Sequence, residues 1–393
     1  MKILYYDWNE FTGQDCRMAL EELGHEVIPF HYDWNRLNED PGFEAALRKE
    51  LGDAERSGKP YTCAFSFNFF PVVSAACERM GMRYISWIFD SPHLPLTSCM
   101  VKNRVNRIWV FDRAMYLQMR AEGISTVFYS PLGVNSTRLR SVVKKLDEMP
   151  VYEHEVSFLG SLYDNEYNFY DQAAEYLPEY LRGYLEGVFT AQQQIFGTDL
   201  IGEESVLPAE KVRELNRYMK FALSGSYRMN LDQVIRDILR KKVTQEERRK
   251  LLERFGKCCK LDLYTQEYSP VIENVYDLGR ADYMEKMPRV FHRSKINLNF
   301  TMRSIRSGIP LRALDIMAAG GFLLTGYQRE LEEYFVNGQE LVMAGCPEEM
   351  QELIGYYLAH DSEREKIARK GKEKTLKQFD YHILLRKMIE ESE

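Results

Sequence analysis

The sequence predicts an α/β protein with two Rossmann-like domains, and three observations support this. The chain has 393 residues, which is enough for two domains with a sizeable core each. Short apolar runs alternate with segments of helical period, as expected for βαβ units and a parallel sheet. The alternation is interrupted near residue 130 and resumes near residue 155, which divides the chain into two parts.

Composition restricts the class of partner. Hydrophobic residues make up 45% and charged residues 28% of the chain, as in ordinary globular proteins. The net charge of −7, without a basic run or a zinc spacing, disfavours a nucleic-acid partner. A local basic loop in an acidic protein indicates a small anionic ligand instead. No apolar run approaches the roughly 18 residues that span a bilayer, so no transmembrane segment is expected.

The seven cysteines favour a reducing compartment. Their number is odd and their spacings form no disulfide framework, so we expect a cytoplasmic protein. The adjacent Cys258 and Cys259 are interpreted as an incidental pair rather than a metal or redox site.

The first domain is expected to span residues 1–135. Its alternation predicts strands at 2–6, 25–32, 61–67, 84–89, 106–111 and 126–129. Helices are predicted between them, at 13–24, 44–57, 72–80 and 113–122. No Gly-x-Gly-x-x-Gly follows the first strand, which argues against a dinucleotide cofactor.

Polar residues follow several of these strands, namely Asp7, Asn9, Asn68, Asp90 and His93. The carboxyl ends of parallel strands meet at one edge of a sheet, where ligands bind. Histidine titrates near neutral pH, so His93 is a candidate acid–base or hydrogen-bonding residue. Each of these residues could instead be a turn residue, because Asn, Asp and Ser favour turns for backbone reasons.

The segment 130–135, Ser-Pro-Leu-Gly-Val-Asn, is typical of a domain junction. The second domain is expected over 136–370. Its first strand, 155–159, leads into Gly160 and Tyr163, a glycine turn that we expect to contact the ligand.

A helical insertion is predicted at about 165–255. Its charged run at 245–250 is interpreted as a solvated face. Its role is open between acceptor recognition and a dimer contact, and the oligomeric state is not indicated.

Further strands are predicted at 260–264, 296–300, 322–325 and 341–343, with helices at 348–360 and 362–378. The last segment, 371–393, is expected to pack back on the first domain. The helix 381–390 would do so through Ile383, Leu384, Lys387 and Met388.

The stretch 295–335 carries the strongest chemical signal. A strand leads into a loop with Arg303, Arg306 and Gly308, and a helix begins near Pro310. Proline suits the first turn of a helix, and Gly320 with its neighbour Gly321 suits its end.

The start of this helix suits a phosphate. Unpaired backbone N–H groups and the positive end of the helix dipole favour an anion there, and guanidinium groups bind phosphate oxygens in pairs. Arg312 lies in the first turn, and Asp315 is placed to accept hydrogen bonds from a ribose. The alternative is an arginine-bearing surface loop on any Rossmann-like domain.

These residues resemble a known family. The resemblance is to the donor-binding segment of group 1 glycosyltransferases, and most of all to the branch of spore maturation proteins of the CgeB type. It rests on six stretches of the chain: 310–325, 329–331, 335–338, 356–364, 67–69 and 87–92.

The resemblance implies a GT-B fold, in which two Rossmann-like domains face each other and the second holds a nucleotide-sugar. It also implies transfer with retention at the anomeric carbon, no catalytic metal and no cofactor. The family's Glu-x7-Glu motif places Ser307 at the first acid and Asp315 at the second. The basic residues that normally follow the strand 155–159 are missing. We expect Arg303, Arg306 or Arg312 to supply that charge.

The interpretation as a glycosyltransferase gives the remaining candidate residues their roles. Asp7, Asp90 and His93 are the catalytic candidates, and Asn9 and Asn68 would line the acceptor side. The acceptor is an unknown protein, glycan or small molecule. No paired carboxylates of hydrolase type are evident from spacing, which disfavours a glycosidase. Two alternatives stay open: a non-catalytic nucleotide-sugar-binding protein, favoured by Ser307, and a sugar-nucleotide epimerase on the same fold.

Overall fold

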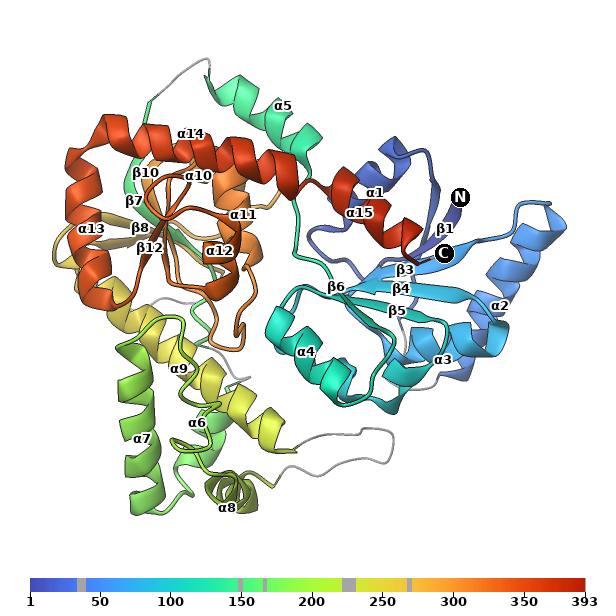
Figure 1. Cartoon of the computed structure of the whole chain (residues 1–393), viewed down its shortest axis with the longest axis horizontal. Helices are drawn as coiled ribbons and strands as arrows, with labels where there is room; N and C mark the ends of the chain where they lie inside the picture. Colours follow the sequence, from blue (N-terminus) through green and yellow to red (C-terminus); the bar gives the residue numbers. More distant parts are fainter. Residues whose placement is uncertain (34–39, 148–150, 165–167, 221–230, 267–270, 393) are drawn as a thin grey trace. The chain divides into compact units, whose positions relative to one another are not determined.

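The computed structural model describes residues 1–33, 40–147, 151–164, 168–220, 231–266 and 271–392. These residues form two compact units. The first comprises 1–135 with 379–392, and the second comprises the described parts of 136–378. Each unit contains a parallel six-stranded sheet with helices around it (Figure 1), which confirms the predicted α/β class.

The sheet of the first unit has the strand order β2-β1-β3-β4-β5-β6, and every pairing is parallel. Its strands lie close to the predicted ranges: β1 Lys2–Tyr6, β2 Glu26–Phe30, β3 Cys63–Phe67, β4 Arg83–Trp87, β5 Asn106–Val110 and β6 Val127–Tyr129.

One face of this sheet is covered by α2, α3 and α4. The helices of the unit are α1 Gly13–Glu22, α2 Pro41–Arg56, α3 Pro71–Met80, α4 Arg113–Ala121 and α15 Tyr381–Glu390, with short 3₁₀ turns at Leu94–Thr97 and Cys99–Lys102. Asp40 caps α2 by accepting from the backbone N–H groups of Gly42 and Phe43. Phe43 and Leu47 of α2 then join the apolar side chains of the strands in one buried core.

The last helix, α15, completes the first unit. It contacts α1, and the ring of its Tyr381 lies 5.4 Å from the ring of Trp87 on the sheet. Of the four side chains expected to pack here, Leu384 and Met388 are buried, whereas Ile383 is half exposed and Lys387 points largely to solvent. Residues 371–378 instead end α14 in the second unit.

The sheet of the second unit has the order β12-β11-β10-β7-β8-β9, again all parallel. Its strands are β7 His154–Leu159, β8 Leu261–Tyr264, β9 Val275–Asp277, β10 Ser294–Asn299, β11 Leu323–Gly326 and β12 Val342–Ala344. The short edge strand β9 was not predicted. It has three residues, none of them fully buried, and so it lacks the apolar run that marks the other strands.

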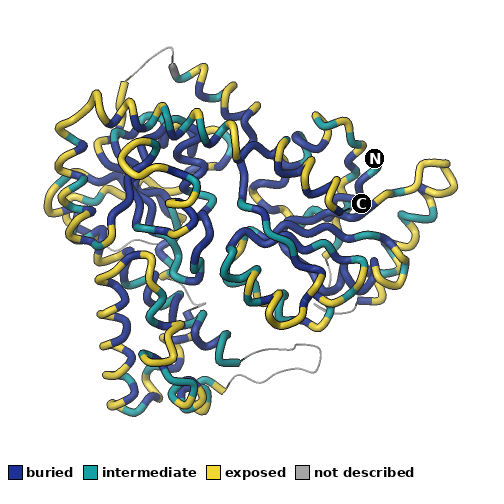
Figure 2. Tube along the Cα trace, in the orientation of Figure 1, coloured by how far each residue is buried: buried dark blue, intermediate teal, exposed yellow. Residues whose placement is uncertain are grey.

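The second unit contains helices that pack on this sheet and a separate group, α6 to α9. They are α5 Ser136–Asp147, α6 Phe169–Ala174, α7 Glu179–Gln193, α8 Ala209–Met219, α9 Leu231–Gly256, α10 Lys286–His292, α11 Leu311–Ala318, α12 Arg329–Tyr334, α13 Pro347–Ala359 and α14 Asp361–Gln378. Figure 2 shows the inner strands of both sheets buried along most of their length, while the outer helices alternate between buried and exposed residues.

The predicted helical insertion forms α6 to α9. These helices enclose a core of their own that includes Leu181, Leu185, Leu215 and Leu239. In Figure 1 they form a group beside the sheet of their unit, with α9 running from the group toward the strands. The second half of α9 leaves that core, and its Leu252 and Phe255 pack in the core of the sheet.

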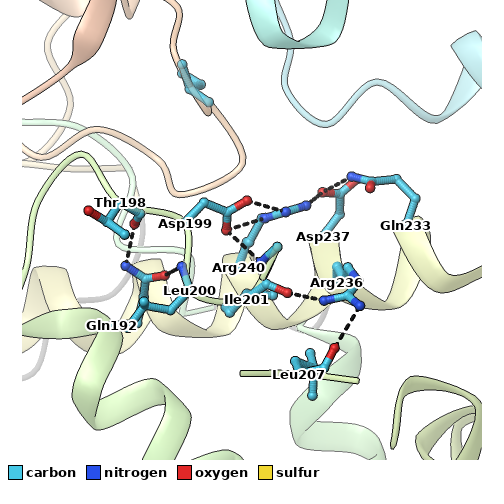
Figure 3. A network of polar contacts seen from close by, with 12 residues as sticks. Gln192, Thr198, Asp199, Leu200, Ile201, Leu207, Gln233, Arg236, Asp237 and Arg240 are labelled. Carbon is cyan, nitrogen blue, oxygen red and sulfur yellow. Dashed lines mark hydrogen bonds and ion pairs between the residues drawn. The ribbon is translucent and has the colours of Figure 1, made fainter. Parts of the chain in front are cut away.

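A buried polar network holds the insertion together (Figure 3). Arg240 of α9 donates to Asp199 and to Asp237, so its charge is compensated on two sides. One turn away, Arg236 donates to the carbonyl oxygens of Ile201 and Leu207. These contacts tie α9 to the chain between α7 and α8, because a buried guanidinium is stable only where its donors are satisfied.

Two further findings concern the whole described chain. All seven cysteines lie within it, and each is a free thiol. None of its helices combines the length and the apolar character needed to cross a bilayer.

Candidate functional site

The end of β1 places Asp7 and Asn9 together. Asp7 forms an ion pair with Arg17 of α1 and accepts a hydrogen bond of 3.0 Å from the backbone of Asn9. Asn9 has a positive φ of 64°, a conformation that asparagine tolerates better than most residues. Glu10 was missed by the sequence reasoning. It is buried, it bonds to the Tyr5 hydroxyl, and burial raises its pKa.

The segments that follow β3 and β4 contain Asn68, Asp90 and His93 and lie in contact with each other. The Asn68 side chain donates to Asp90 Oδ2 at 2.7 Å and accepts from the backbone of Phe89. Like Asn9, Asn68 has a positive φ, here 59°. His93 Nε2 lies 2.9 Å from the carbonyl oxygen of Phe69.

Desolvation lowers the pKa of His93 to about 4. The imidazole is therefore neutral at pH 7, and it carries no positive charge for a ligand at this edge of the sheet.

Trp8 connects these loops. Its indole N–H donates to the carbonyl oxygen of Phe67 at 3.0 Å, and its ring stacks on Phe89 at 6.1 Å between centroids. The predicted residues of the first unit therefore gather at the carboxyl edge of their sheet, as expected. Their assigned roles in catalysis and acceptor binding stay predictions.

In the second unit, Gly160 and Tyr163 lie in the loop after β7. The Gly160 N–H donates to the carbonyl oxygen of Tyr264 at 3.0 Å. Tyr163 has a positive φ of 59°, which strains a bulky residue, and backbone strain of this kind is often found at ligand sites. Its ring is covered by the guanidinium of Arg248 at 4.8 Å.

The prediction that 245–250 is a solvated face is wrong for two of its residues. Glu247 and Arg248 are 3% and 7% exposed, whereas the next residue, Arg249, is exposed. The charged run lies on α9, and this pair faces the loops that follow the strands rather than water. Both residues contact the segment where the sequence predicts the ligand.

Glu247 holds Arg303. The two side chains form a two-pronged ion pair, in which Arg303 Nε lies 3.0 Å from Glu247 Oε2. The Arg303 guanidinium also donates to the carbonyl oxygens of Gln192 and Ile195, and its backbone N–H donates to Thr244. The charge of Arg303 is therefore compensated within the protein, and its role in binding a phosphate stays a prediction.

Arg306 and Gly308 follow in the same loop. Arg306 lines a cavity of about 30 Å³ together with Arg303 and Asp199, and its charge acts on Asp237 of the insertion. Gly308 is buried in the turn that leads from β10 to α11.

Arg312 and Asp315 lie in the first turns of α11, which begins one residue after Pro310 as predicted. Arg312 Nη1 is 3.5 Å from Asp315 Oδ2, and the Tyr283 hydroxyl is 3.4 Å from Asp315 Oδ1. Desolvation lowers the pKa of Arg312. The negative charge of Asp315 raises this pKa, and the positive charge of Arg248 lowers it further. The positive charges of Arg248 and Arg312 therefore act on each other.

Ser307 has a carboxylate partner that the sequence did not reveal. Its hydroxyl donates to Glu330 Oε1 at 2.7 Å, and the Glu330 N–H donates back to the Ser307 carbonyl oxygen at 3.0 Å. Glu330 is 1% exposed. An acid is therefore present beside the position where the Glu-x7-Glu motif has its first glutamate, although it comes from a residue 23 positions later.

Over the ranges that the structure describes, no three His, Cys, Asp or Glu side chains come together in a group that could hold a metal ion.

Comparisons with known proteins agree with the predicted fold. Sucrose-phosphate synthase from Thermosynechococcus elongatus is similar over 99% of this chain and 98% of its own, with 10% identity and a TM-score of 0.55. An α-glucosyltransferase in complex with UDP and a 13-mer DNA is similar over 100% and 99%, with 11% identity and a TM-score of 0.53. Anabaena Alr3699/HepE in complex with UDP and glucose matches over 100% and 99%, with 11% identity and a TM-score of 0.51.

The sequence comparisons are more limited. No curated protein matches the chain. Residues 233–390 match the model of a family described as glycosyl transferase-like, and this range contains Arg248, the loop 300–310 and α11. The two parallel sheets have the GT-B fold, as the resemblance implied, and the second half of the chain is similar to a glycosyl transferase-like family.

Proposed function

We propose that this protein is a glycosyltransferase that moves a sugar from a nucleoside-diphosphate donor to an acceptor. One observation carries the proposal. Within the range that matches the glycosyl transferase-like family, Arg312 and Asp315 lie at the start of α11, beside the carboxyl ends of the strands of a GT-B sheet. Likeness of fold to structures that contain UDP supports a nucleotide ligand.

The residues of the second unit would each have a distinct task. The N-terminus of α11 and the Arg312 guanidinium stabilise the negative charge that develops on the leaving diphosphate. Asp315 accepts hydrogen bonds from the ribose hydroxyls. Retention at the anomeric carbon, transfer without a metal and membership of the CgeB-like branch belong to this proposal through the resemblance alone.

In the first unit we propose an acceptor site. Asp7, Asp90 and Glu10 are carboxylates at one edge of the sheet, and Asn9 and Asn68 offer amide groups there. Such a surface suits the hydroxyl groups of an acceptor. Because the pKa of His93 is lowered to about 4 and its Nε2 contacts the backbone, His93 would be a weak base. A carboxylate whose pKa is raised by desolvation, Glu10 or Asp90, is the better candidate for a general base.

A second candidate is a nucleotide-sugar-binding protein without catalysis. Ser307 favours it, because the first acid of the motif is replaced by a hydroxyl that donates to the buried Glu330. Binding would then persist, whereas the contact that normally orients the donor sugar would be lost.

The test has two steps. A thermal-shift screen with UDP, GDP, ADP, CDP and TDP should identify one diphosphate that raises the melting temperature, because a ligand of the folded state stabilises it. The matching sugar nucleotide is then incubated with the protein, and release of the diphosphate is followed by chromatography. Slow release that disappears in Asp315→Asn supports a transferase, and the exposed Arg329→Ala serves as the control. Binding without release supports the second candidate, and no stabilisation by any diphosphate contradicts both.

A further inference from the structure

Arg248 carries a buried positive charge that forms no ion pair with a carboxylate of the described residues; the charge of Glu247 acts on it only from beyond contact distance. Within the described part of the chain, no Asp or Glu side chain lies within ion-pair distance of its guanidinium. Two other arginines of the unit do pair with acids: Arg240 with Asp199 and Asp237, and Arg303 with Glu247.

The contacts of Arg248 leave part of its guanidinium unused. Nη1 donates to the carbonyl oxygen of Ser161 and Nη2 to that of Phe300 at 2.5 Å. A guanidinium has five N–H groups, and the buried Nε has no hydrogen-bond partner among the described residues. The rings of Phe158 and Tyr163 lie 5.5 Å and 4.8 Å from the guanidinium carbon. Carbonyl dipoles and ring faces favour a cation, but neither neutralises it.

The position of Arg248 in the fold adds a second observation. Ser161 follows β7 and Phe300 follows β10, and these neighbouring strands mark the point where the strand order of the sheet reverses. In open parallel sheets, ligands bind in the crevice outside the strand ends at such a point. Gly160 adds no side chain here; a Cβ on it would lie 3.6 Å from Arg248 Nη1 and 3.2 Å from the Phe158 ring.

We propose that Arg248, on the helical insertion, is a binding residue for the pyrophosphoryl group of the donor. The inference rests on the proposed function and extends it, because it assigns the donor's diphosphate to a residue of α9. The Coulombic influence of Arg248 on Arg312 agrees with it, since two guanidinium groups that share one anion must lie near each other.

A purely structural role is the competing explanation, because Arg248 also ties together the loops after β7 and β10. The two roles differ in what they predict for ligands. A structural tie would affect every ligand of the site alike, whereas a binding residue acts on the diphosphate and not on the nucleoside.

The direct test uses inorganic pyrophosphate, which needs no knowledge of base or sugar. Calorimetry compares the wild type, Arg248→Met and Arg249→Met, of which the last removes the same charge from the next, exposed position of α9. We expect Arg248→Met to weaken pyrophosphate binding about 10-fold or more, as for the loss of a charged hydrogen-bond pair, and Arg249→Met to leave it unchanged. Equal affinities for all three, or no pyrophosphate binding by the wild type, overturn the inference.

The nucleoside comparison separates the two roles. Once the screen has identified the diphosphate, its Kd and that of the corresponding nucleoside are measured for wild type and Arg248→Met. The ratio of the two Kd values should change about 10-fold; a parallel loss for both ligands shows a structural tie and overturns the inference. Diphosphate release by the wild type does not depend on this ratio of Kd values. The release assay therefore tests the proposed function independently of the role of Arg248.

If Arg248→Met does not fold, hydrogen exchange on the wild type gives the answer. Pyrophosphate should slow exchange in 160–164 and 299–303, the two loops that Arg248 contacts. Unchanged exchange in both loops overturns the inference. Arg248→Lys keeps the charge, so its ratio of nucleoside Kd to diphosphate Kd should stay closer to the wild-type ratio than that of Arg248→Gln. Equal ratios for the two variants contradict a role of the charge.

Discussion

The carboxyl edges of the two sheets hold charge in different ways. At the first edge the groups satisfy each other locally: Asp7 pairs with Arg17, Asn68 donates to Asp90, and His93 stays neutral. At the second edge, Arg248 donates to the carbonyl oxygens of two strand-end loops, and no acid among the described residues forms an ion pair with it. This difference underlies the proposal that the first edge binds an uncharged polar acceptor and the second an anionic donor.

The largest expected effect is on stability in the second unit. Glu247→Ala leaves the Arg303 guanidinium buried without its acid, which should cost about 3–5 kcal/mol of unfolding free energy. Urea unfolding followed by circular dichroism measures it. All four tryptophans lie between residues 8 and 109, so the tryptophan fluorescence transition should shift less. The neighbour Glu246, whose ion pairs are longer, provides the control: Glu246→Ala should cost under about 1 kcal/mol. Equal costs for the two variants would refute the contrast.

The second effect is on affinity. Arg312→Ala should weaken binding of the diphosphate found in the screen by about 10- to 100-fold, because a charged contact to phosphate is lost. Arg17→Ala, at the other edge, removes an arginine that also pairs with a carboxylate at a strand end, and it should leave this affinity unchanged. Calorimetry compares the two. Loss of affinity in both variants, or in neither, would show that the diphosphate does not bind at the second edge alone, as proposed.

The smallest effect is the pH dependence of the first edge. The folded pKa of His93, about 4, lies below its unfolded value near 6.5, so the unfolded chain binds the extra proton first. Stability should therefore rise with pH between about 4 and 6.5, with His93 accounting for about 1–2 kcal/mol of destabilisation at pH 5 relative to pH 7. His93→Gln should show a shallower dependence in urea unfolding. An imidazole that NMR finds protonated at pH 6 would contradict a neutral edge.

Local patterns were sufficient to predict most elements. Apolar runs located all strands but β9, and proline with glycine located α11, because these signals act within a few residues. The charged partners at the second edge could not be found in this way. Glu247 and Arg303 are 56 positions apart, and the run around Glu247 has the charge pattern of a solvated helix face. Only the path of α9 along the strand ends turns that face inward.

Ser307 illustrates the same limit in a motif. Alignment to the Glu-x7-Glu pattern shows a missing acid, which favours loss of function. The structure places the carboxylate of Glu330 against the Ser307 hydroxyl, 23 positions away in sequence. A motif records which residue occupies a position, whereas chemistry depends on which atoms reach it.

The return of α15 to the first unit has a consequence for synthesis of the chain. The sheet face that carries Trp87 receives Tyr381 only after the whole second unit has been translated. While some 240 intervening residues are translated, that aromatic face lacks the cover that α15 provides. The nascent first half should therefore be a client for chaperones until the final helix emerges, and a fragment ending near residue 135 should aggregate unless a peptide of 379–392 is added.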